Sequence, residues 1–182
     1  MTITPDSKFS KLASVSQLEK TVESLKNNGF IVEVFENGDF AKSNILQTIP
    51  QKAEVFTMTS VTLDKLGIPT EINESGHYDS VRNKLYSMDR NTQKKQMSAL
   101  GAAPEWALGS VHAVTENGSL LIASNTGSQL SAYAYSALNV IFVIGTQKLV
   151  KNLEVGFERI YSYTFPLEDE RSQKSYGLGS NA

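Results

Sequence analysis

The sequence predicts an α/β domain in which a mainly parallel sheet has helices on both faces. Short segments rich in β-branched and aromatic residues alternate with helical patterns over most of the 182 residues. Residues 139–144 form an unbroken apolar run, which is the pattern of a strand covered on both faces. Polar residues that cap helices follow several of these runs, so each strand is expected to lead through a short loop into a helix.

The first helix is predicted after a polar lead-in, residues 1–13, which we expect to be loose. Ser14 and Gln17 have the spacing of a capping box. Apolar residues at positions 18, 22 and 25 then mark one helical face, and the Asn-Asn-Gly sequence at residues 27–29 is expected to end the helix.

A strand, a helix and a second strand are predicted next. Residues 30–35 are rich in β-branched and aromatic side chains and predict a strand. Asp39 is the expected N-cap of a helix that Pro50 terminates. Residues 53–58 predict the second strand, and the hydroxyl-rich residues 59–62 are expected to cap a short helix ending near residue 66.

The remaining chain is predicted to continue the alternation. Residues 68–80 are expected to be irregular, and two apolar runs joined by a tight turn at residues 115–118 predict short strands within residues 111–123. Helices are predicted around residues 81–88, near 97–100, over 129–137, along a face from 150 to 161, and as a charged turn from Pro166 to residue 174. Residues 175–182 form a glycine-rich tail, and we expect residues 1–182 to make a single domain.

Composition excludes several functional classes. The net charge is −2, with 20% charged and 40% hydrophobic residues, so no strong positive field favours nucleic acid or an anionic membrane. The longest strongly apolar run, residues 140–144, is far too short to span a bilayer. There is no cysteine, which excludes thiolate zinc sites and iron–sulfur clusters on these residues. We therefore expect a cytoplasmic protein without a bound metal or other cofactor.

The candidate ligand site lies in the loops that follow the predicted strands. In parallel α/β sheets, ligands bind beyond the carboxyl ends of the strands. The residues expected to bind a ligand there are Thr59, Ser60, Asn117, Gly118, Asn125, Thr126, Gly127, Ser128, Gly145, Thr146 and Lys148.

The segment Thr126-Gly127-Ser128 would offer hydroxyls and backbone N–H groups at the start of a helix. Such groups can bind an anion, but the same residue types also cap helices with no ligand. Lys148 could bind a carboxylate or phosphate as a point charge, or be a solvated lysine.

Three titratable residues have both a chemical and a structural interpretation. Glu116, on the tight turn, could act as a nucleophile or general base, or simply flank the turn. His112 could face a pocket or make a structural hydrogen bond within a strand. His77, with Glu74 and Asp79, could bind a metal, but the spacing matches no recognised site, and no metal ligands are predicted.

The chain resembles the LUD-domain, or lactate-utilisation, family over about two thirds of its length. The matching motifs are SVTL at 60–63, LGI at 66–68, GSVHAVTENG at 109–118, ASNTGSQL at 123–130, VIGTQKLVKNL at 143–153 and PLEDER at 166–171. The resemblance implies a three-layer α/β/α fold of the CoA-transferase type, shared with ribose-5-phosphate isomerase. Family members commonly continue into a further strand, whereas this sequence ends at Ala182, so the resemblance implies a shortened C-terminus.

The resemblance implies a cluster-free component of lactate or related hydroxy-acid metabolism that binds a small anionic metabolite. A homo-oligomer and a partner iron–sulfur protein are both compatible with it. Two alternatives stay open at this point: an isomerase or transferase that binds a phosphosugar or CoA ester, and a non-enzymatic assembly module.

Overall fold

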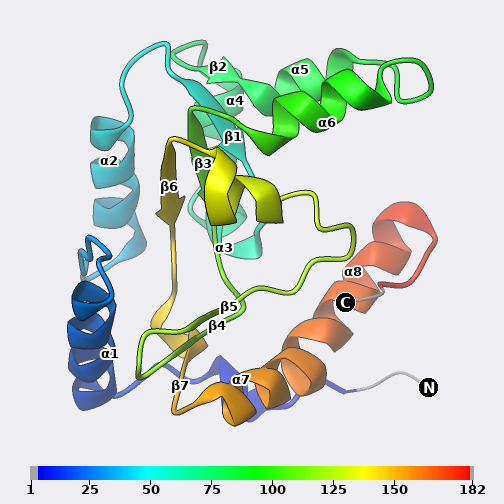
Figure 1. Cartoon of the computed structure of the whole chain (residues 1–182). Helices are drawn as coiled ribbons and strands as arrows, with labels where there is room; N and C mark the ends of the chain where they lie inside the picture. The colour runs from blue at the N-terminus through cyan, green and yellow to red at the C-terminus, as the bar shows by residue number, and fades with distance from the viewer. Residues whose placement is uncertain (1–3, 181–182) are drawn as a thin grey trace. The chain divides into compact units, whose positions relative to one another are not determined.

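The computed structural model describes residues 4–180, which form two compact units. The units are built from residues 34–110 and 126–143, and from residues 1–33, 111–125 and 144–182. Each contains its own sheet, and we name them the parallel-sheet unit and the mixed-sheet unit (Figure 1). Whether the two units together behave as one domain over residues 1–182, as the sequence predicts, is not tested by this division and stays a prediction.

The parallel-sheet unit is built on four strands that all run in the same direction. They are β1 (Glu54–Thr57), β2 (Asp79–Ser80), β3 (Trp106–Gly109) and β6 (Asn139–Phe142), in the order β2-β1-β3-β6. Val55 lies opposite Ser80 on one side and Trp106 on the other, which sets the register of the central strand. The predicted parallel sheet is confirmed.

Helices cover both faces of this sheet, as the α/β/α prediction requires. The helical elements are α2 (Gly38–Thr48), α3 (Val61–Lys65), α4 (Ile68–Glu74), α5 (Val81–Ser87), α6 (Lys94–Ala102) and the π-helix η2 (Ala132–Ser136). Val55 and Leu108 pack against apolar residues of α2, α3 and α4. Ala107 and Met58 pack on the other face with Ala132 of η2. Alternation along β1 and β3 thus places successive side chains in separate helical layers.

The mixed-sheet unit contains three short strands. They are β4 (Ala113–Thr115), β5 (Leu120–Leu121) and β7 (Leu149–Val150), in the order β5-β4-β7. β4 and β5 form the predicted hairpin, and β7 pairs with β4 in parallel. Four buried residues form the core of this unit: Ala113, Leu121, Val150 and Ile160. Its helical elements are η1 (Ser7–Ser10), α1 (Val15–Asn27), η3 (Thr146–Lys148), α7 (Leu153–Arg159), η4 (Ile160–Thr164) and α8 (Phe165–Tyr176).

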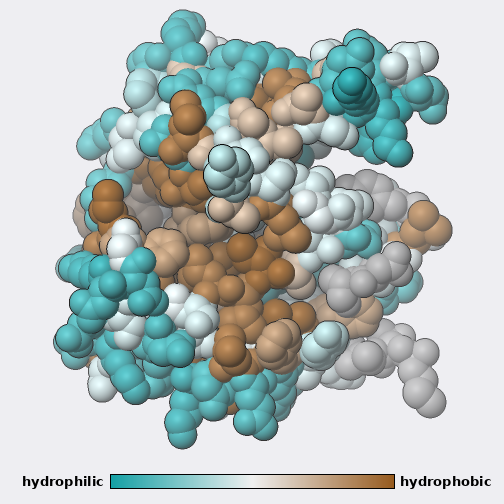
Figure 2. All heavy atoms as spheres, in the orientation of Figure 1, coloured by the Kyte–Doolittle hydropathy of each residue, from teal (hydrophilic) through white to brown (hydrophobic). Residues whose placement is uncertain are grey.

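Helix α1 begins and ends as its sequence predicts. The Ser14 side chain accepts a hydrogen bond from the Gln17 N–H at 3.2 Å, which confirms Ser14 as the N-cap. Gly29 adopts a left-handed conformation with φ +89°, and the Phe30 N–H returns to the Leu25 carbonyl at 3.0 Å. This is the Schellman arrangement that glycine favours at a helix end. Hydrophilic side chains cover the outer surface of α1 (Figure 2).

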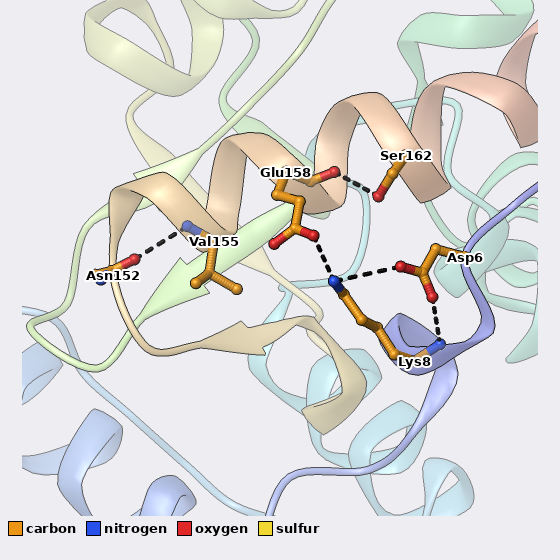
Figure 3. A network of polar contacts seen from close by, with 6 residues as sticks. All are labelled: Asp6, Lys8, Asn152, Val155, Glu158 and Ser162. Carbon is orange, nitrogen blue, oxygen red and sulfur yellow. Dashed lines mark hydrogen bonds and ion pairs between the residues drawn. The ribbon is translucent and has the colours of Figure 1, made fainter.

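The chain from α7 through α8 stays helical across Pro166 because the π-helix η4 precedes the proline and accommodates the missing backbone hydrogen bond. Proline has no N–H to donate to the carbonyl four residues earlier, at Ser162. That carbonyl instead accepts the Asp6 N–H at 2.9 Å, and η4 supplies the wider turn just before the proline. Lys8 of η1 bonds to both Asp6 and Glu158, so residues 6–8 of the segment predicted to be loose are attached to this helix, while residues 1–3 lie outside the described part (Figure 3).

Three predictions about secondary structure in the first eighty residues are wrong. Residues 30–35 form no strand: the Phe30 N–H is used by the end of α1, and Ile31 is 96% exposed. Residues 68–80 are not irregular, because α4 occupies Ile68–Glu74 and packs two isoleucines into the core. Asn37 rather than Asp39 caps α2, accepting N–H groups of residues 39 and 40.

Differences in the second half concern strand and helix type. β3 was not predicted, although it lies at the centre of the sheet. The helix predicted over residues 129–137 is a short distorted segment that contains the π-helix η2. The charged helix after Pro166 is confirmed and extends to Tyr176, after which the tail returns and the Ser180 N–H donates to Asp169 at 2.9 Å. Residues 181–182 lie outside the described part.

Gly109 is expected to tolerate no side chain. A Cβ added there would lie 1.7 Å from Oη and 2.6 Å from Cζ of Tyr133, whose ring packs edge-on against Phe142. We expect Gly109→Ala to lower the free energy of unfolding in urea by about 2 kcal/mol, because the buried ring must move. Gly101→Ala is the matched control: its Cβ meets Phe56 at an ordinary 3.4 Å within α6, so it should be neutral or stabilising. Equal losses in the two variants would contradict the packing argument.

Candidate functional site

The mixed-sheet unit brings together three basic side chains, which we name the His112–Lys148–Arg159 cluster. His112 immediately precedes β4, Lys148 ends the 3-10 turn η3, and Arg159 ends α7. The charges of Lys148 and Arg159 both depress the pKa of His112, so the three groups interact electrostatically.

His112 is held in a neutral form by its surroundings. The Ala123 N–H donates to His112 Nδ1 at 3.1 Å, so Nδ1 carries a lone pair and the ring proton sits on Nε2. Burial, reinforced by Lys148 and Arg159, lowers the pKa of His112 to about 4, with Glu168 acting in the opposite direction. At neutral pH the ring therefore presents an Nε2–H donor.

Arg159 is a buried cation with neutral partners. Its side chain donates to the carbonyl oxygens of His112 and of Gln147, the latter at 3.4 Å, and to the Thr164 hydroxyl at 3.0 Å. The residue is only 3% exposed, and its guanidinium lies 5.1 Å from the ring centroid of Tyr163. Within residues 4–180, no carboxylate forms an ion pair with Arg159.

Lys148 is a lysine whose charge is disfavoured by its position. Burial lowers its pKa to about 8, and the positive charge of Arg159 adds to the effect. The buried Arg159 guanidinium beside a neutral histidine creates a positive potential, which an anion would relieve. The cluster can thus supply an ammonium and an imidazole N–H to an anionic ligand, and near pH 8 an amine that takes up or releases a proton.

The structure places the predicted turn residues against α1. The Glu116 carboxylate pairs with Lys20 at 2.8 Å and accepts from Gln17 at 3.4 Å. The Asn117 carbonyl accepts from the Asn28 side chain at 3.2 Å. Gly118 has φ +83°, and a Cβ there would lie 2.5 Å from Asn28 Nδ2. These contacts give Glu116, Asn117 and Gly118 a structural role in joining the hairpin to the helix.

The predicted anion loop forms a compact turn. Gly127 has φ +69°, and the hydroxyls of Thr126 and Ser128 lie 3.1 Å apart. Asn125 is exposed just before it. The Leu130 N–H returns to the Gly127 carbonyl at 3.0 Å, which starts the helical segment leading into η2. Because that segment is short and partly π-helical, the dipole that a long regular helix would supply is reduced.

The other predicted ligands lie after β1 and β6. Ser60 caps α3, accepting the Leu63 N–H at 3.4 Å, while Thr59 is exposed beside it. Gly145 accepts the Lys148 N–H at 3.0 Å and, with Thr146, forms the turn that presents Lys148. Gly145, Thr146 and Lys148 are therefore together, and Thr59 and Ser60 belong to the parallel-sheet unit.

The family model of the LUD domain matches residues 18–177. The chain belongs to the LUD domain family. The match extends over both units, including the cluster residues and all the predicted ligands. Comparisons with the curated proteins and with the solved structures return no significant match. The likeness to CoA-transferases therefore stays a prediction, while the α/β/α layering is present.

In the part of this LUD domain that the structure describes, no helix is both long and apolar enough to cross a bilayer. Within the same residues, no three His, Asp or Glu side chains are grouped closely enough to hold a metal ion, which includes the segment around His77.

Sequence reasoning identified Lys148 but missed Arg159. On the predicted helical face, Val150 and Ile160 are buried, whereas Leu153, Phe157 and Tyr161 are about half exposed or more. Within α7, the buried residues are Gly156 and Arg159, neither of which was on the predicted face. The available sequence signal is Gly156, three residues before Arg159, because a glycine inside a helix can mark a close approach to another element. In the structure, a Cβ at Gly156 would lie 2.7 Å from Leu121. The close approach of α7 to β5 brings Arg159 inside.

Proposed function

We propose that this LUD domain binds a small anionic metabolite, a 2-hydroxy or 2-oxo acid, at the His112–Lys148–Arg159 cluster. The observation that carries the proposal is the buried guanidinium of Arg159, which has only neutral hydrogen-bond partners among the described residues. A buried charge without a counter-ion is costly, so a ligand carboxylate that supplies the missing negative charge would bind favourably.

The two groups that face a ligand have complementary tasks. The Lys148 ammonium would pair with the carboxylate, and the Nε2–H of His112 would donate to the 2-hydroxyl or 2-oxo oxygen. Gly145 and Thr146 would add backbone and hydroxyl contacts from the turn that carries Lys148. We infer a component of lactate or related hydroxy-acid metabolism, and its 182 residues include no cysteine that could ligate an iron–sulfur cluster.

Lys148→Met tests the proposal directly. The substitution keeps the aliphatic stem but removes the charge, and we expect the affinity for lactate or pyruvate to fall about 10- to 100-fold, the size of a charge-assisted hydrogen bond. Isothermal titration measures it. Lys151→Met, at an exposed position three residues later, is the matched control and should bind as the wild type does. Equal affinities for Lys148→Met and wild type would remove the proposal.

The pH dependence of binding gives an independent check of the same lysine. Because the pKa of Lys148 is about 8, its ammonium form is lost as the pH rises through that value. Carboxylate binding should weaken between pH 7 and pH 9, and this decline should be absent in Lys148→Met. A decline of the same size in the variant would assign the pH dependence to another group.

A ligand panel separates the alternatives. Tighter binding of CoA esters or phosphosugars than of hydroxy acids would favour a transferase or isomerase, and Glu116→Ala would then test Glu116 as the nucleophile. Loss of binding in Thr126→Ala with Ser128→Ala would assign the ligand to residues 125–128 instead of the cluster. A chain that binds no member of the panel and self-associates in sedimentation would favour an assembly module.

A further inference from the structure

A second group of polar side chains gathers in the parallel-sheet unit, at the carboxyl ends of β1 and β3. The chain forms β1 first, then adds β2 on one side and β3 on the other. The connections therefore leave β1 and β3 in opposite directions, and the ends of these neighbouring strands mark the point where the strand order reverses. In open α/β sheets this is where the loops separate and ligands are bound.

Arg82 of α5 is anchored at the end of β1. Its Nε and Nη2 both donate to the Thr57 carbonyl, with the Nε distance 2.9 Å, and Nη1 donates to the Tyr86 hydroxyl at 3.1 Å. The guanidinium lies 5.7 Å from the ring centroid of Phe56. The side-on edge of the guanidinium is thus occupied by one carbonyl, and no carboxylate pairs with it in residues 4–180. The end-on edge, formed by Nη1 and Nη2, faces two hydroxyls: Nη1 contacts Tyr86, and Nη2 donates to the Thr59 hydroxyl over a long 3.5 Å.

Tyr133 brings a hydroxyl to the end of β3 because Gly109 has no side chain. A Cβ at Gly109 would lie 1.7 Å from Tyr133 Oη, so the phenol occupies the space that any other residue would fill. Burial raises the pKa of Tyr133, while a hydrogen bond from the Ser110 backbone N–H and the charge of Arg82 oppose that rise. The phenol therefore stays protonated at neutral pH and is coupled electrostatically to Arg82.

We propose that Arg82, Thr59 and Tyr133 bind the phosphoryl group of a small phosphate monoester at the carboxyl ends of β1 and β3. The three donors come from α5, from the loop between β1 and α3, and from η2. A planar carboxylate would pair best with the side-on edge of Arg82, which the Thr57 carbonyl already uses. A tetrahedral phosphoryl group has three terminal oxygens. One can replace the long 3.5 Å contact between Arg82 Nη2 and Thr59, and the others can accept from the Thr59 hydroxyl and the Tyr133 phenol. This site shares no residue with the His112–Lys148–Arg159 cluster.

The test uses inorganic phosphate and glycerol 3-phosphate as probes, titrated calorimetrically into the full chain at constant ionic strength. We expect saturable binding of glycerol 3-phosphate to the wild type. Tyr133→Phe should weaken it about fivefold or more, because it removes one hydrogen-bond donor and keeps the ring. Tyr135→Phe, two residues away and 91% exposed, is the matched control and should leave the affinity unchanged. Thr59→Val supplies a second independent loss without altering the core, since Thr59 is exposed.

The outcomes distinguish this site from the proposed function. Phosphate-ester binding that persists in Lys148→Met and falls in Tyr133→Phe supports the phosphoryl site, whatever that lysine variant does to lactate. No saturable phosphate-ester binding to the wild type overturns it. Equal affinities of Tyr133→Phe and Tyr135→Phe, with unchanged urea midpoints, also overturn it. Lactate binding that depends on Tyr133 would assign these residues to a carboxylate and reject the phosphoryl group.

Discussion

Arg159→Met is expected to produce the largest loss of stability of any single change considered for this protein. The substitution leaves the carbonyl oxygens of His112 and Gln147 and the Thr164 hydroxyl without their donor inside the mixed-sheet unit. Unpaired buried acceptors cost about 1–3 kcal/mol each, and relaxation recovers part of this, so we expect a loss of about 4 kcal/mol. Urea unfolding followed by circular dichroism measures it.

Two further observations decide whether the guanidinium acts as described. Arg90→Met, at an exposed position in a turn, should change the free energy of unfolding by less than about 0.5 kcal/mol. Because Arg159 lowers the pKa values of both His112 and Lys148, its removal should raise both in an NMR titration. A loss of less than about 1 kcal/mol, the size of one hydrogen bond, would show that water replaces the lost donors.

Acid is expected to destabilise the protein through His112, beginning well above the pH at which carboxylates titrate. The folded pKa is about 4, below the ordinary value of 6.5 that applies in the unfolded chain. Between these values the unfolded state binds a proton that the folded state does not, so the free energy of unfolding decreases as the pH falls from 6.5 to 4. The full difference is roughly 3 kcal/mol, and it is absent above pH 6.5.

Substitution isolates this histidine from the other acid-sensitive groups. In His112→Asn, the amide oxygen can accept the Ala123 N–H in place of Nδ1 but cannot bind a proton in this range. The stability of the variant relative to wild type should therefore improve steadily as the pH is lowered from 6.5 to 4. The control, His77→Asn, makes the same substitution at an exposed residue. A flat difference for His112→Asn would mean that the imidazole is protonated in the folded protein.

Elements with strong local signals could be predicted from the sequence, because the physics that forms them is local. The cap at Ser14 and the glycine end at Gly29 define α1 almost without reference to the rest of the chain. The sequence of β3, Trp-Ala-Leu-Gly, has no β-branched residue, and its strand conformation comes from pairing with β1 and β6. Residues 30–35 show the reverse, with strong strand propensity but no partner strand.

The residues of the candidate sites also differ in whether local sequence or tertiary packing indicates them. Lys148 could be predicted because it follows a strand and a glycine-containing break, which is a property of adjacent residues. Arg159 and Arg82 could not, because an arginine on a helix is usually solvated and only tertiary packing shows otherwise. Gly109 illustrates the difficulty best: its lack of a side chain matters only because Tyr133, distant in sequence, occupies that space.

The alternation of the chain between the two units has a consequence for biosynthesis. The polypeptide passes from one unit to the other at residues 33–34, 110–111, 125–126 and 143–144. A ribosome releasing the chain from its N-terminus supplies β6, the last strand of the parallel-sheet unit, before β7 and α7 of the other unit. During translation the apolar residues of the β4–β5 hairpin therefore remain exposed until β7 and α7 are synthesised, while all four strands of the parallel sheet can already pair. That interval is when a nascent chain of this protein would most need a chaperone.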